Sequence, residues 1–125
     1  MNKSLLIVSA AIEVITGIAL LTAPSAIVTL LVGGSLDSPS ALVLGRIAGA
    51  AVLSLGFACW LARNDGQSRA TRGLIAAMLL YNVAVVALLA HAGLGSWLAG
   101  VGLWPAVVLH AVLTGWCIAC LRPRP

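Results

Sequence analysis

Four long apolar stretches, separated by short segments rich in polar residues, glycine or proline, fill most of the chain. An α-helix needs about 20 apolar residues to cross the roughly 30 Å hydrocarbon core of a bilayer. The pattern therefore predicts four membrane-spanning helices that account for nearly all of the sequence. Their predicted bounds are residues 5–23, 40–61, 71–91 and 96–121.

A shorter apolar piece, residues 25–34, follows the first predicted span. Pro24 ends that span, because a proline inside a helix removes a backbone hydrogen bond. A piece of about ten residues is too short to cross the hydrocarbon core. We expect it to form an interfacial or re-entrant helix, or a bent continuation of the first span. Pro105, inside the fourth predicted span, is expected to kink that helix.

The composition separates this chain from soluble proteins. Hydrophobic residues make up 62% of its 125 residues and charged residues only 8%, whereas soluble domains carry about 25% charged residues. The predicted fold class is all-α, an integral membrane four-helix bundle that forms a single transmembrane domain over residues 1–125. The net charge of +4 comes with no basic patch interleaved with aromatic residues, so we expect no nucleic acid partner.

The distribution of basic residues predicts the orientation. With the N-terminus in the cytoplasm, six of the seven Lys and Arg residues lie on the cytoplasmic side and the two outer loops hold none. This obeys the positive-inside rule and predicts that both termini are cytoplasmic, in a bacterial inner membrane. A signal peptide is the alternative for the N-terminal apolar run, but Pro24 is badly placed for cleavage, so we expect residues 5–23 to be retained. The six residues are Lys3, Arg63, Arg69, Arg72, Arg122 and Arg124.

Each predicted span carries one polar or ionisable residue near its middle: Glu13, Arg46, Asn82 and His110. A central charge costs about 2.5–3.5 kcal/mol on insertion scales. Glu13 and Arg46 differ in predicted depth by roughly 10 Å, which long side chains can largely close. We therefore expect an intramembrane ion pair. It would either fix the helix register or belong to a site that binds an acidic, quinone-like or lipid head group through Arg46.

Four residues are candidates for ligand contacts. Asn82 and His110 are expected near the bilayer midplane, although such residues also simply bridge neighbouring helices by hydrogen bonds. Tyr81 adjoins Asn82 on a different helix face, and Trp104 precedes Pro105, where the fourth helix should open. The sequence indicates no catalytic residue, no metal ligands and no cofactor.

The cysteines give a further hypothesis. Cys117 and Cys120 form a CxxC pair near the end of the fourth predicted span, and Cys59 lies at a similar depth on the second. Membrane oxidoreductases such as the vitamin K epoxide reductase family use a CxxC at a helix end, which would make this chain a thiol oxidoreductase. The predicted cytoplasmic position, where disulfides are usually reduced, favours a packing role instead.

Small residues on the second predicted span indicate close helix contact. Gly45 and Gly49 form a small-xxx-small pair, and Gly56 continues the stripe two turns later. Small residues let membrane helices approach one another. We expect this stripe to pack within the bundle, with a dimer face as the alternative.

Two motifs carry a resemblance to a known family. They are E-x₃-G-x-A-L-L-x-A-P from Glu13 to Pro24 and G-R-x-A-G-A-A-x-L-x-L-G from Gly45 to Gly56. Over most of its length the chain resembles the small four-helix DoxX-like membrane proteins, some of which are linked to thiosulfate–quinone oxidoreduction or membrane redox complexes. The resemblance implies roles only for Glu13 and Arg46. It favours an accessory subunit, or a binder of a lipid or quinone-like ligand, with membrane lipids and a larger membrane complex or homo-oligomer as partners.

The segment AAIEVITG around Glu13 is similar to part of the small multidrug resistance transporters, which have four helices and an essential glutamate on the first. This resemblance implies the alternative function, a proton-coupled small-molecule transporter that uses Glu13. The chain departs from that family at Arg46, and residues 73–91 offer only Tyr81 as an aromatic wall. A salt bridge to Arg46 would also hold the carboxylate ionised and prevent the proton exchange that transport requires.

Overall fold

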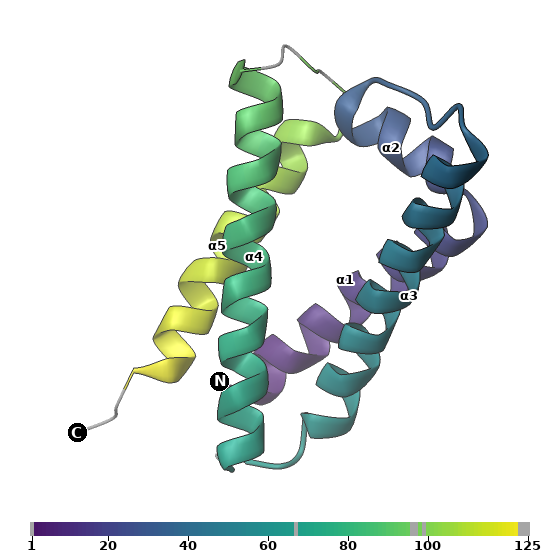
Figure 1. Cartoon of the computed structure of the whole chain (residues 1–125). Coiled ribbons are helices and arrows are strands. Elements are labelled where there is room, and N and C mark those ends of the chain that lie inside the picture. Colours follow the sequence, from purple (N-terminus) through teal and green to yellow (C-terminus); the bar gives the residue numbers. More distant parts are fainter. Residues whose placement is uncertain (1, 67, 96–97, 99, 123–125) are drawn as a thin grey trace.

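The computed structural model describes residues 2–66, 68–95, 98 and 100–122. In this part of the chain all regular structure is helical, and four of the five helices are long and apolar enough to cross a membrane (Figure 1). The lengths and composition of these four helices indicate an integral membrane protein. The helices are α1 (Asn2–Thr22), α2 (Pro24–Val32), α3 (Pro39–Ala62), α4 (Arg69–Gly95) and α5 (Leu103–Leu121).

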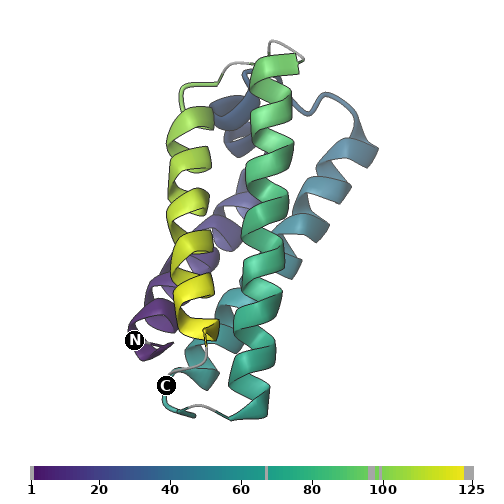
Figure 2. The same ribbon diagram turned by 90° about the vertical axis from the view of Figure 1, so that its left-hand side faces the viewer.

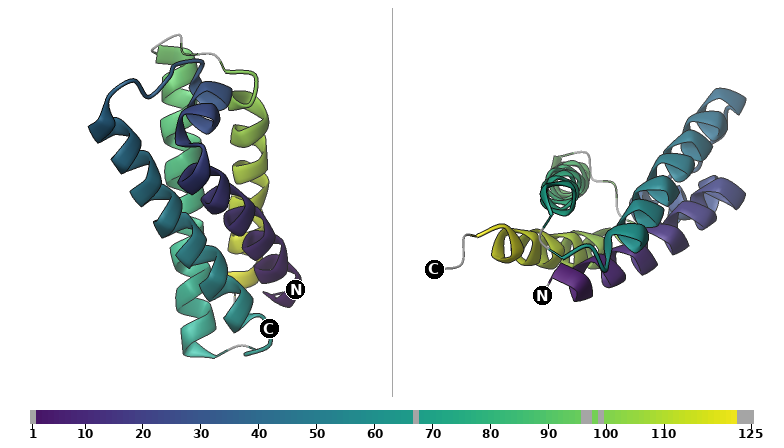
Figure 3. Two further views of the ribbon diagram at one scale, coloured as in Figure 1. Left: turned by 90° about the vertical axis from the view of Figure 1, so that its right-hand side faces the viewer. Right: turned by 90° about the horizontal axis from the view of Figure 1, so that it is seen from below.

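The long helices pack as two antiparallel pairs, α1 with α3 and α4 with α5. The N-terminal end of α1 and the C-terminal end of α5 lie at the same end of the bundle, which we call the terminal end (Figure 2). The two pairs come together there and diverge towards the opposite, distal end, where α2 lies (Figure 1). Seen from below, the pairs stand at an angle to each other instead of forming a square bundle (Figure 3).

The buried core lies where the two pairs meet, and all four long helices contribute to it. It is apolar and includes sulfur-containing side chains, which adapt well to irregular space between helices. The pairs diverge beyond this core, and a cavity remains between them in the distal part of the bundle. The core residues are Leu5, Leu6, Ala10, Cys59, Ile75, Met78, Leu113, Cys117 and Cys120.

Glycines allow α1 and α3 to approach closely. A Cβ atom added to Gly17 would lie 2.6 Å from the backbone nitrogen of Leu53, and one added to Gly56 would lie 2.9 Å from that of Val14. At Gly49 an added Cβ atom would come within 2.8 Å of the α1 backbone. No side chain fits at these positions without moving a helix. The interpretation of Gly49 and Gly56 as packing residues within the bundle is therefore confirmed.

These contacts fix the register of α1 against α3. Gly56 lies beside Glu13, whereas Gly45 lies beside Pro24, immediately after the end of α1. Arg46 adjoins Gly45, so it lies at the level of the C-terminal end of α1. Glu13 and Arg46 are thus separated by about ten residues, or about 15 Å, along the helix axes.

α2 bridges the two pairs at the distal end. Pro24 is its first residue, where proline loses no helical hydrogen bond, and Gly33 ends it in the left-handed region with φ of 76°. The segment between α4 and α5 holds the far end of α2, because the Gly102 N–H donates to the Leu30 carbonyl at 2.8 Å. Gly100 also lies against the backbone at Leu30 with no room for a side chain. The short helix predicted after Pro24 is therefore present as a separate element.

The end of α4 and the start of α5 differ from the predicted bounds. α5 begins at Leu103 and not at Ser96, and α4 continues to Gly95, four residues past its predicted end at 91. Pro105 is consequently the third residue of α5, in the first turn, where N–H groups have no acceptor within the helix. A proline there removes no hydrogen bond, so the reason to expect a kink disappears. Residues 96, 97 and 99, within the predicted fourth span, lie outside the described residues.

We expect Gly49→Leu to lower the free energy of unfolding in detergent by about 1–3 kcal/mol, because the added side chain has no space between α1 and α3. The matched control is Gly115→Leu on α5, where an added Cβ atom meets nothing within 4 Å. That change should stay within about 0.5 kcal/mol of the wild-type value. Equal destabilisation by both substitutions would contradict the close α1–α3 approach.

Candidate functional site

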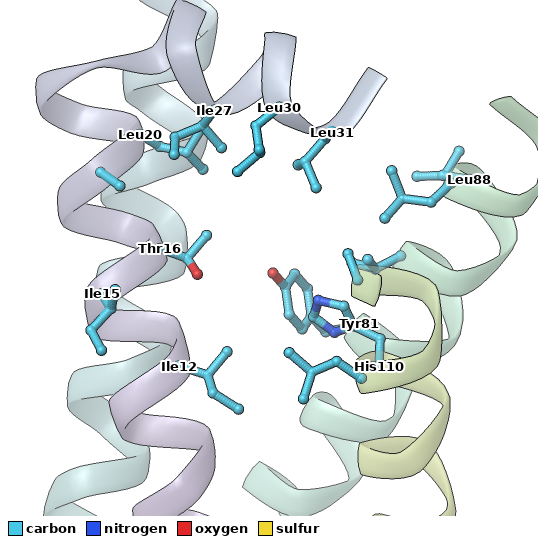
Figure 4. Close-up of a pocket in the computed structure, with 15 residues that line it drawn as sticks. Ile12, Ile15, Thr16, Leu20, Ile27, Leu30, Leu31, Tyr81, Leu88 and His110 are labelled. Carbon is cyan, nitrogen blue, oxygen red and sulfur yellow. The ribbon is translucent and has the colours of Figure 1, made fainter. Parts of the chain in front are cut away.

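A cavity of about 420 Å³ lies between α1, α2, α4 and α5, on the distal side of the core (Figure 4). Its walls are mainly aliphatic, with Ile27, Leu30 and Leu31 of α2 covering its distal end. Three lining residues carry a polar side chain, and they come from three different helices: Thr16, Tyr81 and His110. The divergence of the helix pairs therefore leaves an apolar space into which a few polar groups project.

Tyr81 and His110 form the polar side of this cavity. The Tyr81 hydroxyl projects into the cavity from α4 towards the Thr16 hydroxyl on α1 (Figure 4). The ring of His110, from α5, stands edge-on to the ring of Tyr81, with 5.8 Å between centroids and an interplanar angle of 80°. Such an arrangement is favourable for two aromatic rings and keeps both in place.

Asn82 orients the His110 ring. Its Oδ1 lies 2.7 Å from Nδ1 of His110, and both residues are buried. The Nδ2 group of Asn82 donates to the Met78 carbonyl at 2.7 Å, which fixes the orientation of the amide. Since an amide oxygen only accepts, this pattern assigns the donating hydrogen to Nδ1 of His110. In the neutral ring Nε2 is then left as a hydrogen-bond acceptor.

Glu13 lies close to Tyr81 but does not line the cavity. It is 1% exposed, and neither carboxyl oxygen has a hydrogen-bond partner among the described residues. Tyr81 is close enough to interact electrostatically, but no hydrogen bond of ordinary geometry joins the two side chains. Ser9, one turn earlier on α1, is also fully buried with its hydroxyl unpartnered in the described part of the chain. α1 thus presents two unsatisfied polar groups to the interior.

The predicted ion pair between Glu13 and Arg46 is wrong. Glu13 is buried beside Gly56, whereas Arg46 is exposed on α3. The register places the two residues about 15 Å apart along the helix axes. Arg46 also lies about 80° around α3 from the middle of the glycine stripe that contacts α1, so it projects to the side of that contact, where it is exposed. The prediction rested on the depth of each residue in the bilayer, counted from the end of its own span. Such a count contains neither the register of α1 against α3 nor the rotation of each helix about its axis.

The ligand contacts predicted from the sequence are only partly brought together. Tyr81 and His110 line the cavity, but Asn82 and Trp104 do not. Asn82 acts on the cavity only through His110. Trp104 is 48% exposed, and its ring packs near Gly93 of α4, outside this cavity, so its role as a ligand contact stays a prediction.

Thr16 is a lining residue that the sequence analysis missed. It lies one turn after Ile12 on α1, and both residues face the cavity (Figure 4). A hydroxyl in an apolar span was the available signal. It is a weak signal, since a helical threonine often satisfies itself on the preceding turn of its own backbone.

The cysteines lie at the terminal end of the bundle, away from the cavity. Cys59 and Cys117 are fully buried in the core, and Cys120 is 7% exposed. None of the three lines the cavity. In the described part of the chain, no group of three or more His, Cys, Asp or Glu side chains is placed to hold a metal ion.

A scan of the chain against protein-family models finds no match, and searches of curated proteins and of solved structures find none either. In the described residues the fold and the site define a class only: a helical protein of membrane type, with a largely apolar cavity between two helix pairs. The resemblances to DoxX-like proteins and to small multidrug resistance transporters stay predictions.

We expect the Asn82–His110 hydrogen bond to appear as an energetic coupling between the two residues. Asn82→Ala, His110→Phe and the double variant should give a coupling of about 0.5–1.7 kcal/mol in the free energy of unfolding, the range for hydrogen bonds between membrane helices. In a control cycle, Val83→Ala takes the place of Asn82→Ala and is combined with His110→Phe. Val83 is a 46% exposed position of α4, so its substitution should show no coupling with His110→Phe. Additive effects of Asn82→Ala and His110→Phe would refute the proposed orientation of His110.

Proposed function

We propose that this protein binds a lipid-soluble molecule with a polar ring or carbonyl head group, of the quinone type, in the cavity between the helix pairs. The observation that carries the proposal is the convergence of Tyr81 and His110, with Thr16 opposite, on a cavity whose other lining residues are apolar. Small-molecule sites typically have apolar walls, a few fixed polar groups and a volume of about 300–1,000 Å³. The cavity here, at about 420 Å³, is of this kind.

The hydrogen-bonding groups match such a head group. The Tyr81 hydroxyl can donate to a ligand carbonyl, and Nε2 of His110 can accept from a ligand hydroxyl. The same site could therefore hold both the carbonyl and the hydroxyl form of a quinone-like ring, packed against two aromatic rings. Arg46 lies outside the cavity, and no described lining residue carries a positive charge. This favours a neutral head group over an acidic one.

The cavity walls also indicate how an apolar ligand would reach the site. Ile15 and Leu88 both line the cavity, and each is 69% exposed. In a membrane these exposed aliphatic side chains would face lipid, so the ligand would enter sideways from the hydrocarbon. α2 would meanwhile separate the cavity from water at the distal end.

We further propose the wider role of an accessory subunit of DoxX-like type in a bacterial inner membrane, with both termini cytoplasmic. The described basic residues other than Arg46 support this orientation, because they all lie at or near the helix ends of the terminal end: Lys3, Arg63, Arg69, Arg72 and Arg122. Asp37 lies in the loop at the distal end, between α2 and α3. This charge asymmetry is the one that the positive-inside rule describes.

We expect Ala106→Phe to abolish binding of a short-chain ubiquinone analogue, because the added ring fills the cavity. Tyr81→Phe should weaken binding about three- to tenfold through the loss of one hydrogen bond. Binding is measured by isothermal titration calorimetry in detergent. Ala111→Phe is the matched control, since it adds the same ring at an exposed position of α5. Unchanged binding to the Ala106→Phe protein would overturn the proposal.

A second candidate function is proton-coupled transport through Glu13. The observation that favours it is that neither carboxyl oxygen of Glu13 has a partner among the described residues, so none of these residues pairs with Glu13 to hold it ionised. Titration with a lipophilic amine in weakly buffered solution separates the two functions. Transport predicts that binding of the amine releases a proton from the wild-type protein but not from Glu13→Gln. Binding of the quinone analogue alone, with no proton released by the amine, supports the first proposal.

A further inference from the structure

A second hollow, about 410 Å³ in volume, lies on the outer face of the α1–α3 pair and shares no residue with the cavity. We call it the α1–α3 groove. The small residues Ala10 and Ala11 make room for it, while Phe57 and Trp60, 58% and 46% exposed, form its α3 wall. Its remaining lining residues are Ile7 and Val14 of α1.

Two cationic side chains flank this groove at the terminal end. The Arg63 guanidinium lies over the Trp60 ring, 3.8 Å from its centroid, and its Nη1 group donates to the Trp60 carbonyl at 2.5 Å. Lys3 is exposed and lies one turn before Ile7, so both project from the same face of α1. The register of α1 and α3 places Lys3 and Arg63 within about a turn of each other along the helix axes. One end of the groove is therefore positively charged.

No neighbouring carboxylate neutralises these cations among the described residues. The acidic residue nearest to Arg63 in the sequence is Asp65, whose carboxylate accepts hydrogen bonds from Ser68 and Thr71. Arg63 uses one of its five N–H donors on the Trp60 carbonyl, which leaves the others for a ligand. Stacking on Trp60 holds the guanidinium in place before any ligand binds.

We propose that the α1–α3 groove is a binding site for one anionic phospholipid. The acyl chain would lie over Ala10 and Ala11 beside Phe57, and the phosphate would bind between Lys3 and Arg63. A guanidinium matches the geometry of phosphate oxygens, and basic residues at a membrane surface attract anionic lipids. Tryptophan is typical of the head-group level. Both cations lie at the ends of spanning helices, which is where the head groups of a bilayer lie.

The test is native mass spectrometry of the detergent-solubilised protein, titrated with phosphatidylglycerol or with phosphatidylcholine of the same acyl chains. The first phosphatidylglycerol should bind more tightly than the first phosphatidylcholine. Lys3→Gln and Arg63→Gln should each weaken phosphatidylglycerol binding about fivefold and leave phosphatidylcholine binding unchanged. Arg69→Gln is the matched control, because it removes the same charge at the same end of the bundle but outside the groove.

Ala11→Phe tests the apolar part of the site independently of its charges. Ala11 is exposed, so the substitution fills the groove without disturbing the core. Phosphatidylglycerol binding should fall while both cations remain. Equal affinities of the wild-type protein for the two lipids would overturn the proposal. An equal loss of phosphatidylglycerol binding in Arg69→Gln would also overturn it, as would unchanged phosphatidylglycerol binding in Ala11→Phe. A second copy of the chain that occupies this face in place of lipid would overturn it as well. None of these outcomes bears on quinone binding in the cavity.

Discussion

The close crossing of α1 and α3 is the contact on which the arrangement of the other helices depends. Packing in a membrane gains little from burying apolar surface, because lipid is as apolar as the helix, so helices associate through close contact between small residues. Gly17 on α1 and Gly49 and Gly56 on α3 provide this contact. The register that results turns Glu13 into the interior and leaves Arg46 exposed nearer the distal end of α3.

The cavity follows from how the second pair joins the first. At the terminal end the two pairs share a core, whereas at the distal end α2 lies between them, with its Leu30 carbonyl bound to the N–H of Gly102. The helices therefore converge at one end and stay apart at the other. The hydrogen bond between Asn82 and His110 adds a polar link within the α4–α5 pair. It leaves the other nitrogen of the imidazole as a hydrogen-bond acceptor beside the cavity.

The spanning helices and the separate helix after Pro24 could be predicted from the sequence, because apolar length and proline position determine them locally. The start of α5 could not, since hydropathy does not distinguish an apolar connecting segment from the first turns of a helix. Tyr81 and His110 could be singled out because polar groups in apolar spans are costly. The predicted ion pair of Glu13 with Arg46 was wrong for a different reason. Sequence spacing gives depth along one helix, but the register and rotation between two helices depend on contacts made in three dimensions.

A double-mutant cycle on Glu13→Gln and Arg46→Gln tests the α1–α3 crossing most directly. The free energies of unfolding of the wild-type protein, the two single variants and the double variant are measured in one detergent. The crossing predicts additive effects, with a coupling within about 0.3–0.5 kcal/mol, because the two residues share no contact. A coupling above about 1 kcal/mol, with the double variant more stable than either single variant, would mean that the two charges interact and would contradict the register.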